Sequence, residues 1–308
     1  MSRALLITGA TGKQGGALID SVLARQPANF LLLAVTRNAN SASAKRVAAK
    51  SSSIKIIEGD LNAIPDLFKS AKAVAGEVPL WGVYSVQAAV STDKSMTLDI
   101  EVQQGRSLVD ESIKAGVQHF VYSSVERGGD ERSWVNPTPV PHFKTKHEIE
   151  IHLRDATQGT PMGWTILRPT IFMDNLSPGF ESKVLLTILR DTLKEKPLQW
   201  VSTKDIGFFG AEAFLHPDVW NKKTIGLVSD ELTASQLDES FFRATGKPAP
   251  ITFGLLAKAV KARVKELGVM VDWFRDEGYK ANRSTFQKVH PAHQTLESWL
   301  RDSSFAKK

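Results

Sequence analysis

Short apolar runs alternate with helix-like segments along the first half of the chain. The run 30–36 (FLLLAVT) has no polar alternation, which is typical of a strand buried on both faces. Further strands are predicted at 4–8, 54–57, 81–86, 118–123 and 162–167. Helices are predicted between them, at 16–25, 41–50, 65–75, 97–115 and 142–154. This repetition predicts an α/β fold of the Rossmann type, a doubly wound parallel sheet with helices on both faces.

After Pro169 the strand–helix alternation loosens, and shorter elements follow. They are predicted at 184–193, 204–213, 224–228, 233–245 and 253–267. We therefore expect a core domain at 1–168 and a smaller α+β region at 169–308, some of whose elements return to the core. The segment 127–141 (RGGDERSWVNPTPVP) is too long for a simple connection, so a lid or pocket wall is expected there.

Composition excludes several classes of protein. The 308 residues are 42% hydrophobic and include no cysteine, so no disulfide, thiolate metal site or cysteine nucleophile is possible. No apolar run approaches the roughly 18 residues of a membrane span, and no signal peptide is expected, which favours a cytoplasmic protein. The net charge is +6, and the densest group of basic residues is at 258–268. This group is either a solvated helix face or a surface that binds a partner. We expect neither direct nucleic-acid binding nor a metal site, because basic stripes and metal-ligand spacings are missing.

A glycine-rich loop follows the first predicted strand and opens the first helix. Gly9, Gly12 and Gly15 have the spacing G-x-x-G-x-x-G in "GATGKQGG". Glycine lets the backbone turn tightly and approach a pyrophosphate, and the helix N-terminus then faces the anion. In this strand–turn–helix context the motif predicts a dinucleotide site. The loop also contains three further candidate contacts, Thr11, Lys13 and Gln14.

The end of the second strand indicates which dinucleotide binds. A site for NAD places an acid there for the ribose 2′-hydroxyl, whereas this chain has Arg37, which can pair with a 2′-phosphate. Lys13 adds charge, so NADP(H) is favoured over NAD(H), although Arg37 could also be an ordinary surface residue. Asp60 ends the third strand, followed by Leu61, and its carboxylate could accept from the adenine amino group or cap a helix.

Together these residues resemble the NmrA-like group of atypical short-chain dehydrogenase/reductase proteins. The resemblance covers nearly the whole chain. It is carried by "ITGATGKQGG", "AVTRN", "EGDL", "FVYSSVE", "PHFKTKHEIEIHLRD", "MGWTILRPTIFMDNL" and "TIGLVSDELTASQLDESF". It implies NADP(H) binding by an extended Rossmann fold with a small C-terminal substrate domain. It also implies cofactor contacts from Val86, Gln87 and Lys146, and from the segment 169–175 at the nicotinamide end. Within that segment the candidates are Pro169, Phe172 and Asn175.

The proton relay of the catalytic relatives is incomplete in this chain. Their Tyr-x-x-x-Lys pair reads His142-x-x-x-Lys146 here, with both side chains on one helix face. The reactive hydroxyl of extended relatives would fall on Val125, unless Ser124 replaces it.

Two groups could take over the proton transfer. His142 has an imidazole suited to acid–base chemistry near neutrality, with a packed or surface histidine as the alternative. Glu126 follows the carboxyl edge of the sheet, where ligands bind, and an apolar surrounding would raise its pKa. Its alternatives are a loop carboxylate or a salt bridge to Arg127 or Arg132.

Three functions remain open from the sequence. The first is an NADP(H)-dependent oxidoreductase or biosynthetic tailoring enzyme acting on a carbonyl, imine or activated double bond of a small molecule. The second is a non-catalytic sensor that reports the NADP(H) state to a protein partner. The third is an acid–base enzyme, such as a cyclase or isomerase, in which NADP(H) forms the pocket floor.

Overall fold

A computed structural model describes residues 2–25, 30–87 and 97–306. The chain divides into two compact units, and each of them is built from three stretches of sequence. The first unit consists of Met1–Ser124, Thr145–Leu167 and Ile206–Thr224. The second unit consists of Val125–Lys144, Arg168–Asp205 and Ile225–Lys308.

A seven-stranded sheet has the order β3-β2-β1-β4-β5-β6-β9. Its strands are β1 (Arg3–Ile7), β2 (Phe30–Thr36), β3 (Ile54–Glu58), β4 (Leu80–Ser85), β5 (His119–Ser123), β6 (Gly163–Pro169) and β9 (Lys223–Leu227). All neighbouring pairs from β3 to β6 run parallel. The order reverses direction at β1 and β4, so the predicted doubly wound Rossmann-type fold is confirmed.

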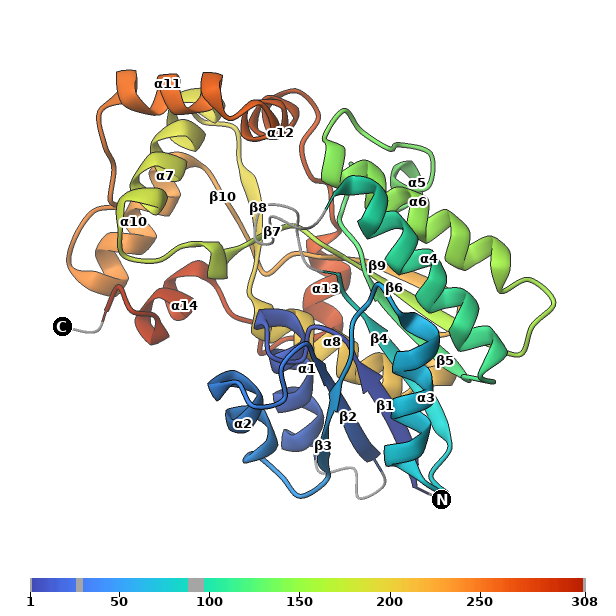
Figure 1. Cartoon of the computed structure of the whole chain (residues 1–308). Coiled ribbons are helices and arrows are strands. Elements are labelled where there is room, and N and C mark those ends of the chain that lie inside the picture. The colour runs from blue at the N-terminus through green and yellow to red at the C-terminus, as the bar shows by residue number, and fades with distance from the viewer. Residues whose placement is uncertain (1, 26–29, 88–96, 307–308) are drawn as a thin grey trace. The chain divides into compact units, whose positions relative to one another are not determined.

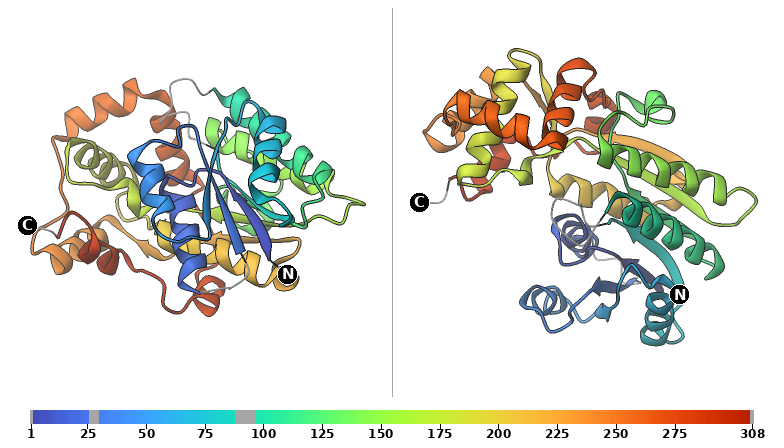
Figure 2. Two further views of the ribbon diagram at one scale, coloured as in Figure 1. Left: turned by 60° about the horizontal axis from the view of Figure 1, so that its bottom comes forward. Right: turned by 45° about the horizontal axis from the view of Figure 1, so that its top comes forward.

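Helices cover both faces of this sheet (Figures 1 and 2). One layer holds α3 (Ile64–Ala75), α4 (Leu98–Lys114) and α6 (Pro141–Ala156), and the other holds α1 (Lys13–Ala24), α2 (Ala42–Ala48) and α8 (Thr203–Leu215). A Cβ placed on Gly207 of α8 would lie 2.4 Å from the backbone of Ala17 in α1. Helices α8 and α1 can pack this closely because glycine has no side chain. The short helix α9 (Pro217–Trp220) leads into β9.

The second unit is built around a small sheet with the order β10-β8-β7. Its strands are β7 (Ile171–Phe172), β8 (Leu198–Val201) and β10 (Asp230–Leu232). Its helical segments are α5 (Asp130–Ser133), η1 (Met173–Asn175), α7 (Phe180–Leu193), α10 (Ala234–Thr245), α11 (Gly254–Arg263), α12 (Lys265–Asp276), α13 (Arg283–Val289) and α14 (Leu296–Asp302). Among the residues that the structure describes, no helix has both the length and the apolar character that crossing a membrane requires.

The predicted element at 253–267 is two helices, α11 and α12, that meet at Val264. The backbone of Val264 is not helical, with φ −93° and ψ 84°, and it ends one helix and precedes the next. Gly268 then lies against the carbonyl of Lys261, where a Cβ would come within 3.0 Å of the oxygen. Apolar periodicity continues across such a turn, so the sequence pattern did not reveal the break.

Candidate functional site

The glycine loop between β1 and α1 has a geometry that only glycine allows. Gly9 has φ +59°, and its carbonyl accepts a hydrogen bond from the N–H of Gly12 at 2.9 Å. A Cβ on Gly15 would lie 2.4 Å from the carbonyl oxygen of Gly9. The first turn of α1 is therefore folded tightly back onto the end of the β1 strand.

The N-terminus of α1 is open to an anion. Its N-cap is Gly12, no side chain of the described residues caps it, and no acidic residue lies in its first turn. Backbone N–H groups and the positive end of the helix dipole face outward at such a terminus, which fits a pyrophosphate. Thr11 and Lys13 are exposed beside it, whereas the side chain of Gln14 accepts a hydrogen bond from Ser123 Oγ at 2.5 Å.

The carboxyl end of β4 lies against the glycine loop. Thr8 Oγ1 donates to the carbonyl of Val86 at 2.9 Å, and Val86 Cγ1 lies 2.7 Å from where a Gly9 Cβ would be. Gln87 donates from Nε2 to Ser85 Oγ at 2.9 Å. Its buried Oε1 has no hydrogen-bond partner within the described part of the chain. An unpartnered acceptor next to the loop fits a ligand that offers a donor.

Arg37 and Glu58 lie where β2 and β3 end. Arg37 is exposed directly after β2. Glu58, which pairs in register with Thr36, accepts a hydrogen bond from the N–H of Ala39 at 2.9 Å. This contact was not predicted, because it joins two strand ends that are 19 residues apart. The hydrogen bond from Ala39 thus engages one carboxylate oxygen of Glu58, the residue that ends β3.

Asp60 takes part in a local turn before α3. Its Oδ1 accepts from the N–H of Asn62 at 2.9 Å, and its carbonyl accepts from the N–H of Ala63 at 3.0 Å. The side chain is exposed, and Leu61 beside it is half-buried. The turn contact agrees with the alternative that Asp60 caps the following helix. The second carboxylate oxygen, Oδ2, could still accept a hydrogen bond from the adenine amino group.

Lys146 is held by a buried carboxylate on the neighbouring helix. Its Nζ lies 2.8 Å from Glu101 Oε1, and Thr145 Oγ1 donates to Glu101 Oε2 at 2.9 Å. Glu101 is only 1% exposed. An ammonium has three N–H donors and this pair uses one of them, so the lysine is positioned and can still bind ribose hydroxyls. Glu101 was missed by the sequence analysis, and its place in the first turn of a predicted helix is the only local signal.

Ser124 follows β5 and is the last residue of the first stretch of sequence in the first unit. Its side chain is buried, and its N–H donates to the carbonyl of Leu167 at 2.8 Å. The next residue, Val125, belongs to the second unit.

His142 forms a close pair with a carboxylate in the second unit. Its Nδ1 lies 2.6 Å from Glu266 Oε1, and the imidazole packs edge-on against Phe143 with ring centroids 4.7 Å apart. The hydrogen bond from His142 lowers the pKa of Glu266, so the carboxylate is ionised and Nδ1 is the donor. A carboxylate that orients an imidazole in this way is a common feature of acid–base sites. Glu266 is 124 residues away in sequence, and no local pattern marks it.

Glu126 is enclosed by backbone donors. It is fully buried and accepts hydrogen bonds from the N–H groups of Gly128 and Lys280, each at 3.0 Å, and of Gly129. Burial raises its pKa, and the three N–H groups oppose that rise. Burial, and secondarily Glu126, raises the pKa of Tyr279 well above its usual value. In this structure Glu126 joins the start of the 127–141 loop to the segment after α12.

The predicted nicotinamide-end residues lie on a short stretch of the second unit. Pro169 ends β6 and its carbonyl accepts from the N–H of Glu126 at 3.1 Å. Phe172 ends β7 and is half-buried, and Asn175 ends η1 and is exposed. Between them Asp174 accepts from the N–H and the hydroxyl of Thr203, at 2.8 and 2.7 Å. This pair anchors η1 to the start of α8.

The predicted residues thus fall into both units. The first unit holds Gly9, Thr11, Gly12, Lys13, Gln14, Gly15, Arg37, Asp60, Leu61, Val86, Gln87, Ser124 and Lys146. The second unit holds Glu126, His142, Pro169, Phe172 and Asn175. Helix α6 carries His142 and Lys146 one turn apart, so the two groups share one element.

Comparison with known proteins gives consistent results. The NmrA-like family model matches residues 1–300. An NmrA-like family domain-containing oxidoreductase of Aspergillus hancockii is 27% identical over 263 residues, which cover 80% of this chain and 74% of that protein. Citrobacter sp. triphenylmethane reductase complexed with NADP(H) has a TM-score of 0.71 at 18% identity, covering 98% of this chain and 99% of that one. NmrA, a negative transcriptional regulator, in complex with NADP has a TM-score of 0.67 at 18% identity, covering 98% and 95%. At such identity the two structures establish the shared fold.

Proposed function

We propose that this chain, which belongs to the NmrA-like family, is an NADP(H)-dependent oxidoreductase that reduces a carbonyl, imine or activated double bond of a small organic molecule. The proposal rests on the N-terminus of α1, which follows a loop whose geometry requires glycine and which carries no side-chain cap from the described residues. Arg37, directly after β2, provides the positive charge for a 2′-phosphate. Two solved structures with the same fold hold NADP(H) or NADP, which supports this choice of cofactor.

The residues of this chain divide the work of cofactor binding. Gly9 and Gly15 bring the backbone close to the pyrophosphate, and Arg37 pairs with the 2′-phosphate. Gln87 accepts a hydrogen bond from the cofactor through its buried Oε1, for which the described residues provide no partner. Lys146, positioned by Glu101, binds the hydroxyls of the ribose next to the nicotinamide. When bound, NADPH supplies the hydride of the reduction.

His142 is the proposed proton donor. Glu266 accepts from Nδ1–H, which fixes the ring, and Nε2 is the nitrogen proposed to exchange a proton with the substrate. Glu126 is proposed as a positioning residue, since three backbone N–H groups engage its carboxylate and its burial separates it from water. In this proposal Ser124 contributes to the shape of the site after β5.

The test measures the rate of NADPH oxidation in the presence of quinones, enones and imines. The rates of two variants with substitutions on helix α6 are compared. His142→Gln should lower kcat by roughly 100-fold or more, the usual contribution of a general acid. His152→Gln is the matched control, because His152 also lies on α6 and also pairs with a carboxylate, Asp110, at 2.7 Å. Equal rates for both variants would remove His142 from the chemistry, and no oxidation with any substrate would reject the reductase.

The absence of the usual tyrosine favours a second candidate, a sensor that binds NADP(H) and reports its redox state to a protein partner. NmrA, which shares this fold, is a negative transcriptional regulator. Calorimetry with NADP⁺ and NADPH, with and without candidate partner proteins, tests this candidate, because a sensor must bind its partner with an affinity that depends on the cofactor's redox state. Turnover of a small molecule in the absence of any partner would reject the sensor.

The pair of His142 and Glu266 also fits a third candidate, an acid–base tailoring enzyme that uses the cofactor only structurally. Such an enzyme would form the same product with NADP⁺ and with NADPH. A strict requirement for NADPH would exclude it.

A further inference from the structure

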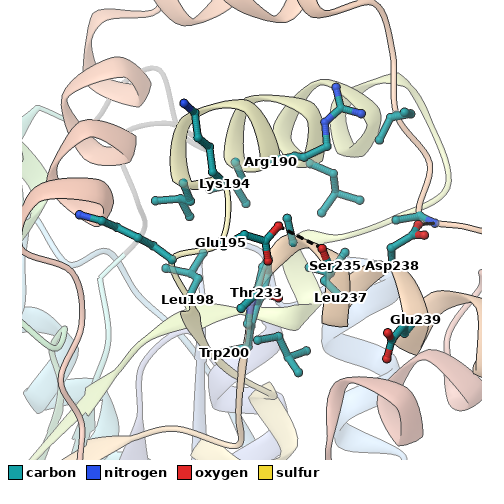
Figure 3. A pocket seen from close by; sticks show the side chains of 18 of the residues that line it. Arg190, Lys194, Glu195, Leu198, Trp200, Thr233, Ser235, Leu237, Asp238 and Glu239 are labelled. Atoms are coloured by element: carbon teal, nitrogen blue, oxygen red, sulfur yellow. Dashed lines mark hydrogen bonds between the residues drawn. The ribbon is translucent and has the colours of Figure 1, made fainter.

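A pocket of about 630 Å³ lies between α7 and α10 in the second unit (Figure 3). Leucine is the most frequent residue in its lining, but the basic residues Lys194 and Lys196 and the acidic residues Glu195, Asp238 and Glu239 line it as well. Because both signs of charge are present, the lining favours no one class of ligand, and we assign none to it.

Arg37, in the first unit, lies between two hydrogen bonds that tie its neighbours to the end of β3. On one side, the carbonyl of Thr36 accepts from the N–H of Gly59 at 3.0 Å. On the other side, the N–H of Ala39 donates to Glu58 Oε2 at 2.9 Å. Thr36 and Glu58 are also partners in the β2–β3 register. Two consecutive residues at the end of β3 therefore hold the chain on both sides of Arg37.

Further hydrogen bonds shape the connection between β2 and α2. Asn38 donates from its N–H to Thr36 Oγ1 at 3.3 Å, and its Oδ1 accepts from the N–H of Asn40 at 2.9 Å. Ser41 then caps α2 with its side chain. These contacts join residues of the connection to one another, whereas the carboxylate of Glu58 joins the connection to the neighbouring strand.

The carboxylate of Glu58 has two opposing effects on a 2′-phosphate bound to Arg37. Its negative charge repels the phosphate, which carries the same sign. Its hydrogen bond holds the backbone beside Arg37, so less conformational freedom is lost when the guanidinium binds the phosphate. Glu58 is exposed, and water and salt screen the repulsion between exposed charges. We therefore expect the positioning effect to be the larger one.

We propose that Glu58 is a positioning residue for Arg37 and so helps to select NADP(H) over NAD(H). Its carboxylate fixes the chain after Arg37 to the end of β3, which preorganises the guanidinium for the 2′-phosphate. NADH has no phosphate at this position, so its affinity does not depend on Glu58. The inference rests on the proposed function, in which Arg37 binds the 2′-phosphate.

Calorimetric titrations of the full chain with NADPH and with NADH test this role in three variants. Glu58→Ala should bind NADPH about five-fold more weakly than the parent chain, the equivalent of about 1 kcal/mol, and should bind NADH unchanged. Glu58→Gln should bind NADPH at least as tightly as the parent chain, because an amide oxygen accepts the same hydrogen bond without the negative charge. Glu77→Ala is the control and should leave both affinities unchanged. Glu77 is an exposed acid before β4, at the opposite edge of the sheet, and its removal changes the net charge equally.

Three results would overturn the proposal. If Glu58→Ala binds NADPH as tightly as the parent chain or more tightly, Glu58 does not position Arg37. An equal loss of NADPH and NADH affinity would make Glu58 a merely structural residue. A loss in Glu58→Gln as large as that in Glu58→Ala would exclude the hydrogen bond as the cause. Absence of NADPH binding by the parent chain would instead reject the proposed function, and this inference with it.

A double-mutant cycle tests whether Glu58 acts through Arg37. On an Arg37→Ala background, Glu58→Ala should weaken NADPH binding no further, because the guanidinium that it positions is gone. Additive losses, with the same factor on both backgrounds, would contradict the proposal.

Discussion

The close packing of the glycine loop predicts opposite effects on stability for alanine substitutions at two adjacent glycines, Gly15 and Gly16. In the Gly15→Ala variant the new Cβ would meet three backbone atoms, Gly9 O at 2.4 Å, Gly9 C at 2.6 Å and Ala10 Cα at 2.8 Å. Backbone cannot rotate away as a side chain can, so the start of α1 must move. Overpacking of this kind costs about 1–3 kcal/mol of unfolding free energy. The movement should weaken NADPH binding by at least roughly ten-fold, about 1.4 kcal/mol, because the anion site is the displaced backbone itself.

Gly16→Ala is the matched control for this variant. Its Cβ would lie 3.7 Å from the carbonyl oxygen of Ala10, an ordinary contact. Replacing a helical glycine by alanine removes unfolded-chain entropy and should stabilise the protein by roughly 0.5–1 kcal/mol. Urea unfolding should therefore separate the two variants by about 1.5–4 kcal/mol, and NADPH fluorescence titration should separate their affinities. Equal stability and equal NADPH affinity of the two variants would refute the assigned role of the loop.

Three further predictions concern single side chains. Arg37→Ala should bind NADPH roughly 10- to 100-fold more weakly and NADH unchanged in calorimetry, since a charge-assisted hydrogen bond contributes about 1.5–3 kcal/mol; an equal loss for both cofactors would contradict a 2′-phosphate contact. Lys146→Met should instead weaken both cofactors equally and lower the unfolding free energy by about 3 kcal/mol, because Glu101 keeps a buried charge without its cation; selective loss of NADPH binding would be unexpected. Burial lowers the pKa of His119 to about 4 from 6.5, so its contribution to stability is present above pH 6.5 and is lost as the pH falls towards 4. The stability difference between the parent chain and His119→Gln should therefore shrink by roughly 1.5 kcal/mol between pH 6.5 and pH 5 in urea titrations, and a constant difference would show that His119 does not titrate there.

The sequence predicted the fold well because its signals are local. The buried run 30–36 is a strand with the predicted ends, and the glycine spacing falls between β1 and α1 as expected. The family and the cofactor class agree with the comparisons for the same reason, since the motif residues lie within a few positions of each other.

The contacts that organise the site were not predictable in the same way. Glu101 meets Lys146 across two helices, and Glu266 meets His142 from a helix at the other end of the chain. Such partners are set by tertiary packing, which has no signature in a single sequence. Glu126 illustrates the opposite case: its place after a strand was visible, but the three backbone donors that enclose it were not. The short strands β7, β8 and β10 were also missed, because two to four residues carry too little periodicity.

The central claim is that this chain holds NADP(H) on its glycine loop, with Arg37 binding the 2′-phosphate. Calorimetric titration of one protein preparation with NADPH and with NADH, at the same ionic strength, tests it most directly. We predict one site per chain with NADPH at least ten-fold tighter than NADH, the equivalent of about 1.4 kcal/mol. Equal affinity for the two dinucleotides, or no binding of either, would contradict the account.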